Sequence, residues 1–204
     1  MSDATRQQSS GSVDLYWLPL GAGGRCVRLN GRIFELLVAH HEHRRSRDLY
    51  HSALEVRLGA DRWVIEMAPV WNTPEPDRGV VAEGPVGLRW LGRYRLFRYE
   101  VRCWRGGRIP DVDEAVDSPV RLSADPEHAR RVLSLAAQFR TATWGRDEQR
   151  CGEMWNSNSL TSWLLVSSGL DRTSVSPPAG GRAPGWEAGL VVASRGDARR
   201  RSSR

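Results

Sequence analysis

The sequence contains no lysine, so all 30 of its Lys-plus-Arg residues are arginines. These arginines are spread along the chain, whereas a nucleic-acid-binding surface concentrates its basic residues on one face. Nucleic acid is therefore not the expected partner, and its association through the arginines is the weaker alternative, although the net charge is +6. We attribute the exclusive use of arginine to GC-rich coding, as in some bacteria. The final basic run is expected to be a solvated tail, and its contact with an anionic surface is the alternative: Arg199, Arg200, Arg201 and Arg204.

Long apolar runs are also absent. No segment approaches the roughly 18 consecutive apolar residues that a membrane-spanning helix needs, so no membrane span is expected. Residues 1–12 are polar and lack the apolar core of a secretory signal. The sequence therefore predicts a cytoplasmic protein.

Cysteine is scarce, because Cys26, Cys103 and Cys151 are far apart and form no Cys-x-x-Cys pair. This spacing indicates neither a zinc knuckle nor a dithiol redox motif. An odd number of cysteines without a secretory signal favours reduced thiols. We expect no cofactor.

Histidines cluster at His40, His41 and His43. His40 and His43 are three residues apart, so they share one face of a helix and suggest a metal site. No Asp or Cys completes a four-ligand set at a familiar spacing. We interpret the cluster as the polar end of a helix and predict no metal.

The length of 204 residues and the 40% hydrophobic content suit one domain. We expect a disordered N-terminal tail over residues 1–12 and a single domain over 13–171. A loop and a short apolar C-terminal segment are expected over 172–193, followed by a disordered Arg-rich tail over 194–204.

Hydrophobic periodicity predicts an α+β domain in which an antiparallel sheet packs against helices. Strands are expected at residues 13–20, 49–58, 62–70, 79–86 and 93–104. Helices are expected after Asn30, after Ser123 or Asp125 as caps, and over 156–170, where Gly169 is the stop signal.

The first candidate for chemistry is His51, at the start of an expected strand. If Gly59 and Ala60 form a two-residue turn, Leu58 pairs with the residue after the turn, and His51 shares one face of the hairpin with Glu66. A carboxylate there would orient the imidazole and raise its basicity. A one-residue slip would separate the two side chains. The simpler interpretation is a structural strand histidine.

The second candidate is Ser157, which lies where the last expected helix begins. Free N–H groups and the helix dipole at that end favour a developing negative charge. A serine nucleophile needs a base, and His51 is the one we propose. Asn156 or Asn158 would hold the loop or a developing oxyanion. The alternative is that Asn156, Ser157 and Ser159 only cap the helix. Cys151 is another thiol nearby, which we interpret as incidental.

These two motifs resemble a known family. Residues 50–56 read Tyr-His-Ser-Ala-Leu-Glu-Val, and about a hundred residues later 156–160 read Asn-Ser-Asn-Ser-Leu. This order resembles the circularly permuted papain-like fold of NlpC-type enzymes, lecithin–retinol-acyltransferase-type enzymes and small deSUMOylating isopeptidases, including bacterial members with Ser in place of the nucleophilic Cys. The resemblance covers about residues 45–170. It implies that His51 is the base and that Ser157 stands at the position of the nucleophile.

Two functions follow from this resemblance. The first is a hydrolase or acyltransferase-like activity on an amide or ester, with Ser157 as nucleophile, His51 as base and Glu66 as orienting carboxylate. The second is a catalytically inactive papain-like domain that binds a peptide or small ligand. Ser157 stands where the family has a cysteine, and a hydroxyl is far less nucleophilic than a thiol. The second function, binding without catalysis, therefore remains an alternative.

Overall fold

The computed structural model describes residues 10–20, 48–70, 76–173 and 175–202. The helix expected after Asn30 and the histidine cluster lie outside these residues, as does Cys26.

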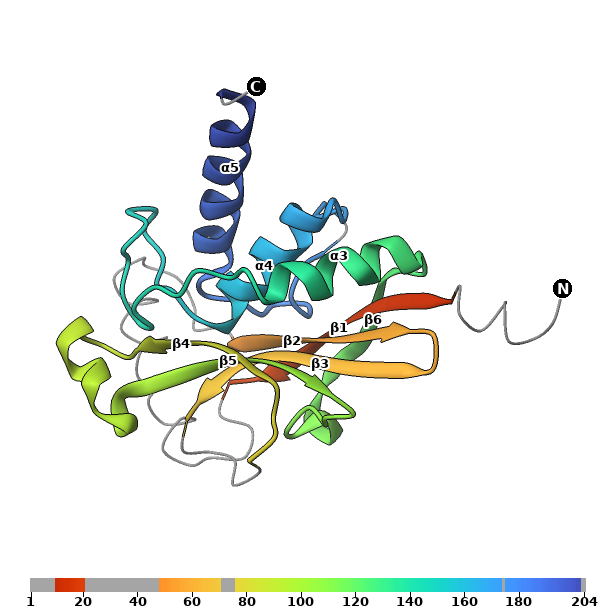
Figure 1. Ribbon diagram of the computed structural model, residues 1–204, viewed down its shortest axis with the longest axis horizontal. Helices are drawn as coiled ribbons and strands as arrows, with labels where there is room; N and C mark the ends of the chain where they lie inside the picture. The colour runs from red at the N-terminus through yellow and green to blue at the C-terminus, as the bar shows by residue number, and fades with distance from the viewer. Residues whose placement is uncertain (1–9, 21–47, 71–75, 174, 203–204) are drawn as a thin grey trace, which may run out of the picture.

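Six strands form one sheet in the order β4-β5-β3-β2-β1-β6, with every neighbouring pair antiparallel. The strands are β1 (Gly11–Pro19), β2 (Tyr50–Leu58), β3 (Asp61–Pro69), β4 (Val80–Pro85), β5 (Arg98–Arg105) and β6 (Val116–Ser123). The helices are α3 (Pro126–Ala136), α4 (Ser157–Ser168) and α5 (Trp186–Ser202). All three helices lie on the same side of the sheet (Figure 1). The predicted α+β class, an antiparallel sheet packed against helices, is confirmed.

The hairpin of β2 and β3 has the predicted register. Gly59 and Ala60 form the two-residue connection, and Leu58 pairs with Asp61. Gly59 has a φ of 61°, in the left-handed region that tight hairpin turns require. Local turn chemistry is therefore enough to set the register of the central strands.

The start of β5 differs from the prediction of one strand over 93–104. Residues Arg89–Arg93 and Arg95–Phe97 form two short 3₁₀ turns, and the strand begins only at Arg98. The side chains of Tyr94 and Leu96 are exposed. An alternating pattern predicts a strand because the apolar set of residues is expected to be buried. In residues 93–97 the apolar side chains are exposed, so the pattern does not indicate a strand.

An additional strand, β6, lies where the sequence predicts no element. It pairs with β1 at the edge of the sheet, with two irregularities in register, and it contains Pro119. Proline and irregular pairing are typical of edge strands, and both weaken the period-two pattern. β1 itself begins at Gly11, two residues inside the expected tail.

Helices α3 and α4 begin at the predicted caps. The side chain of Asp125 accepts a hydrogen bond from the N–H of Glu127, and Pro126 occupies the first turn of α3. Asn156 caps α4, and Gly169 ends this helix with a φ of 85°.

Helix α5 replaces the predicted short apolar segment and disordered Arg-rich tail. It runs from Trp186 to Ser202 and packs against α4. At Gly189 a side chain would collide with the carbonyl oxygen of Ser159 and with Ser162 Oγ. Packing against α4 at this close contact therefore stabilises a helix whose own sequence pattern is weak.

The two faces of the sheet differ. Trp17, Leu54 and Val56 belong to the main core, which includes buried residues of all three helices. Leu18, Ala53 and other residues form a smaller apolar cluster on the opposite face. Consecutive residues of a strand point to opposite faces, so this division fixes the direction of every β2 side chain.

Candidate functional site

The side chain of Asn158 joins the start of α4 to β2. Its Nδ2 donates to the carbonyl oxygen of Tyr50 at 2.9 Å, and its Oδ1 accepts from Ser52 Oγ at 2.8 Å. Nδ2 also donates to the carbonyl oxygen of Pro184 at 2.8 Å. Asn158 is only 1% exposed. Tyr50 and Ser52 flank His51. The strand motif (residues 50–56) and the helix motif (residues 156–160) therefore lie side by side in the fold.

Other polar side chains in the cap and first turns of α4 anchor the segment that leads into α5. Asn156 Nδ2, Ser159 Oγ and Ser162 Oγ each donate to one carbonyl oxygen of residues 184–186, all at 2.7 Å. Asn156 Oδ1 also accepts from the N–H of Asn158 at 2.9 Å. Asn156 and Asn158 therefore hold the segment that leads into α5 in position.

Ser157 differs from these neighbours. It is the first residue of α4 and is buried. The capping box is formed by Asn156 and Ser159, so capping does not use the Ser157 hydroxyl. Within the described ranges, this hydroxyl makes no hydrogen bond.

His51 leaves β2 on the face away from α4. β2 pairs with β1 from end to end without a bulge, so its side chains alternate regularly. Ser52 faces α4, because its hydroxyl bonds to Asn158. His51, one residue earlier, therefore faces the other way. No hydrogen bond between His51 and Ser157 exists in the part of the chain that the structure describes.

Burial determines the electrostatics of His51. It lowers the pKa of His51 to about 4, because a charged ring loses its hydration in the interior. The ring is therefore neutral at pH 7, as a general base must be. A pKa this low nevertheless makes it a weak base, since efficient bases titrate near the working pH.

Glu66 lies on the same face of the hairpin as His51, as the register predicts, but it has a different partner. Arg102 Nη1 donates to its carboxylate at 2.9 Å. Arg102 is 0% exposed and also donates to Glu100 at 3.0 Å. Burial raises the pKa of Glu66, and Arg102 partly offsets this effect. Glu66 therefore belongs to a buried ion-pair network of the sheet, and its expected role as orienter of His51 has no support in the geometry.

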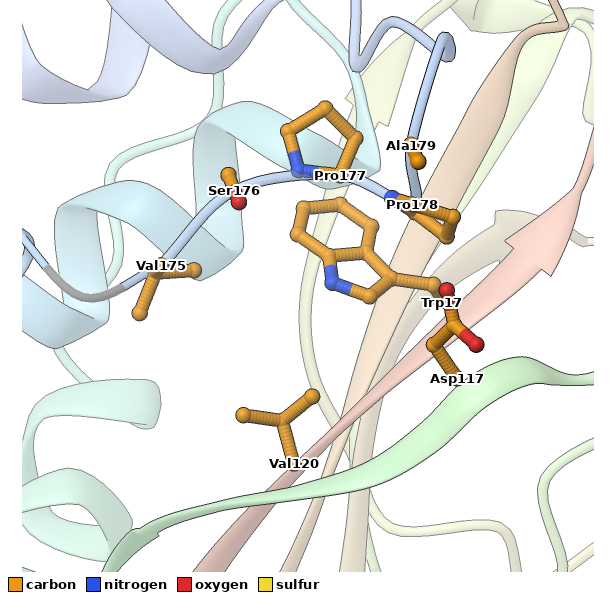
Figure 2. A pocket seen from close by; sticks show the side chains of 8 residues that line it. All are labelled: Trp17, Asp117, Val120, Val175, Ser176, Pro177, Pro178 and Ala179. Carbon is orange, nitrogen blue, oxygen red and sulfur yellow. The ribbon is translucent and has the colours of Figure 1, made fainter.

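A cavity of about 250 Å³ lies between the strands β1 and β6 and the loop before α5 (Figure 2). The strands contribute Trp17, Asp117 and Val120, and the loop contributes residues 175–179, which include Pro177 and Pro178. Most of these side chains are apolar, which is typical of a site for a small molecule.

The buried indole of Trp17 lines this cavity. Trp17 is 1% exposed, and its Nε1 has no hydrogen-bond partner among the described residues. Figure 2 shows this nitrogen on the side of the ring that faces Val120 and Val175. The backbone N–H of Trp17 donates to Ser118 Oγ at 2.8 Å, and its ring packs 5.4 Å from that of Trp186. These contacts hold the unpaired donor in one position.

Asp117 supplies a carboxylate at the rim of the same cavity. This residue is exposed and has a φ of 46°, a left-handed conformation that aspartate tolerates better than most residues. The sequence did not predict this site, because Trp17 reads as a core residue and no motif links it to residues 175–179. An unpaired indole nitrogen is visible only after folding.

Other kinds of site find no support in the described residues. Among them no three His, Cys, Asp or Glu side chains come together as metal ligands. No helix in the same ranges is long and apolar enough to cross a membrane.

Comparisons with known proteins add no relative. No family model matches the chain. Searches of curated proteins and of solved structures find no match either.

Proposed function

We propose that the chain is a permuted papain-like domain without a catalytic pair, and that it binds a small ligand in the cavity beside Trp17. The order of the two motifs and the contact of Asn158 with β2 support the family. The direction of His51 supports the lack of a catalytic pair. The observation that carries the binding function is the cavity beside the buried Trp17 indole, whose Nε1 has no hydrogen-bond partner among the described residues.

The energetic argument concerns this one donor. A buried N–H without an acceptor costs about 1–3 kcal/mol, and native proteins contain few of them. Neighbouring side chains cover the nitrogen, so a ligand reaches it only when they move; an acceptor oxygen on the ligand then removes this cost. The interaction is also selective, because an apolar molecule of the same size leaves the donor unpaired.

The lining of the cavity defines the ligand further. Pro177, Pro178 and Val120 offer apolar contacts, Trp17 offers one donor, and Asp117 offers one acceptor at the rim. A short secondary amide has the matching groups: a carbonyl oxygen, an N–H and an apolar substituent. The volume of about 250 Å³ is below the usual range for a drug-sized molecule, so the ligand is small or is one side chain of a peptide.

Nuclear magnetic resonance tests this proposal on the full chain. The protein has nine tryptophans, and Trp17→Phe identifies the indole N–H signal of Trp17 by removing it. The probe is N-methylisobutyramide, which carries all three groups. We expect a progressive shift of the Trp17 indole signal on titration. We also expect about tenfold weaker binding to Trp17→Phe, the loss of one hydrogen bond of about 1.4 kcal/mol.

Two controls make the result specific. Trp90→Phe, a change on an exposed side chain, is expected to leave the affinity unchanged. The neutral alkane 2-methylpentane, which has a similar shape but no acceptor oxygen, is expected to cause no shift of the Trp17 signal. The proposal fails if the amide moves no Trp17 signal at saturating concentration, or if Trp17→Phe binds the amide as well as the parent chain does.

A serine hydrolase is the second candidate, and one observation favours it: the Ser157 hydroxyl at the start of α4 has no hydrogen-bond partner in the described ranges. A fluorophosphonate probe tests this function, with Ser157→Ala and His51→Ala as comparisons. We expect no labelling of Ser157, because His51 faces away and is a weak base. Labelling that both substitutions abolish would replace the first proposal by the second.

A further inference from the structure

Large apolar side chains are exposed in one short segment. Trp90 is 58% exposed and Leu96 is 65% exposed, and Leu88, Tyr94 and Phe97 are exposed as well. Among the described residues, Val80 is the only other exposed large apolar side chain. Such concentration marks an interaction surface, because soluble chains rarely gather exposed apolar groups in one patch. We name residues 88–98 the aromatic–arginine surface.

The backbone of this surface is ordered. The N–H of Leu91 donates to Leu88 at 3.0 Å, that of Tyr94 to Leu91 at 2.9 Å, and that of Phe97 to Tyr94 at 3.0 Å. The N–H of Val86 donates back to Phe97 at 2.9 Å and ties the segment to the end of β4. Figure 1 shows the two 3₁₀ turns at one end of the molecule, beyond β4 and β5. The exposed side chains therefore project from a fixed support.

Arginines surround these apolar groups. Arg93 lies over the ring of Trp90 at 5.4 Å and over that of Tyr94 at 4.8 Å. Arg89 and Arg98 pair with carboxylates, whereas neither Arg93 nor Arg95 makes an ion pair with another described residue. The surface thus combines apolar side chains with at least two positive charges that pair with no carboxylate of the described residues.

We infer that the aromatic–arginine surface binds the face of an anionic lipid bilayer. Tryptophan and tyrosine favour the interfacial zone of a bilayer, leucine and phenylalanine enter its apolar edge, and arginine attracts anionic headgroups. A single-stranded nucleic acid would instead stack its bases on open ring faces. Arg93 already covers faces of Trp90 and Tyr94, and Leu96, the most exposed apolar side chain, offers no surface for stacking.

Co-sedimentation of the full chain with vesicles tests this inference. One vesicle contains only phosphatidylcholine, and the other contains phosphatidylcholine mixed with the anionic lipid phosphatidylglycerol. We expect binding to the anionic vesicle, weakened by salt, and little binding to the neutral one. Arg93→Ala and Arg95→Ala are each expected to weaken binding about fivefold, the change that corresponds to about 1 kcal/mol per basic residue.

Leu96→Glu tests the apolar component, and we expect it to abolish sedimentation at the concentrations where the parent chain binds. Leu96 is 65% exposed, so this change should leave thermal unfolding unaltered. The matched control is Arg130→Ala, which removes an exposed arginine of α3 and should leave binding unchanged. The inference is overturned if the anionic vesicle binds no protein or if Leu96→Glu binds normally. It is also overturned if a single-stranded oligonucleotide, and not the vesicle, gives binding that depends on Arg93.

Discussion

Asn158 should be a main structural residue of the helix motif, and Ser157 should not. We predict that Asn158→Ala strongly destabilises the chain, whereas Ser157→Ala leaves its stability nearly unchanged. The two residues are adjacent, and both are buried. They differ in their partners, because the Asn158 side chain makes three hydrogen bonds from its amide and the Ser157 hydroxyl makes none within the described ranges.

The expected magnitude follows from these bonds. A hydrogen bond in the interior contributes about 1 kcal/mol net, so the loss of three costs about 3 kcal/mol. The carbonyl oxygen of Pro184 keeps a second donor in Asn156, and Ser52 keeps a second acceptor in Thr161, which limits the cost. For a chain of this size, about 3 kcal/mol corresponds to a decrease in Tm of about 6–12 °C.

Urea unfolding followed by circular dichroism measures both variants against the parent chain. The free energy of unfolding should fall by about 2–4 kcal/mol for Asn158→Ala and by less than about 0.5 kcal/mol for Ser157→Ala. Equal losses in the two variants would refute the reasoning, because they would mean that Ser157 has an unrecognised structural role. A neutral Asn158→Ala would refute it as well.

Three further predictions concern other parts of the fold. Burial lowers the folded-state pKa of His51 to about 4, below its ordinary 6.5, so the unfolded chain takes up a proton that the folded chain does not. Stability should therefore fall as the pH decreases from about 6.5 to about 4, and His51→Gln should flatten this decrease in urea unfolding; parallel profiles would contradict the assignment. Arg102→Met should cost about 3–5 kcal/mol by the same assay, since it leaves the buried carboxylate of Glu66 without its guanidinium while Glu100 keeps Arg78, and a loss below about 1 kcal/mol would count against the buried network. Gly189→Ala should cost about 1–3 kcal/mol because the new methyl group collides with α4, whereas Gly196→Ala meets no atom within 4 Å and should raise helix stability by up to about 1 kcal/mol. Equal effects on thermal unfolding would show that α5 does not pack closely at Gly189.

Local signals in the sequence predicted much of the fold. The Gly59-Ala60 turn set the hairpin register, and Asp125, Asn156 and Gly169 marked the ends of helices correctly. Each of these signals acts through backbone geometry or a bond between residues close in sequence. Such interactions are readable without knowledge of the tertiary structure.

The elements that the sequence did not predict depend on distant contacts. Helix α5 is stabilised where Gly189 packs on Ser159, thirty residues earlier in the chain. The strand β6 exists because β1 offers it an edge. The 3₁₀ turns of residues 89–97 carry apolar residues that are exposed, so their pattern misleads any method that equates apolar with buried.

In the candidate site, too, local features were predictable from the sequence, whereas contacts between distant residues were not. Asn158 joins the two motifs in the fold, and Glu66 lies on the face of His51 that the hairpin register predicts. The partner of Glu66 was not predictable, because Arg102 comes from β5, a strand that pairs with β3 only in the folded sheet. The unpaired nitrogen of Trp17 is likewise a property of the assembled core.

The direction of His51 follows from the energetics of β2. Leu54 and Val56 have the same parity as Ser52, and both are completely or almost completely buried against the helices. Turning His51 toward α4 by a one-residue shift would move these two side chains out of the core, at a cost of about 1.5–3 kcal/mol each. A hydrogen bond between His51 and Ser157 would return about 1 kcal/mol. The burial of Leu54 and Val56 therefore decides which way His51 points, so the spacing of the two motifs does not by itself bring His51 and Ser157 together.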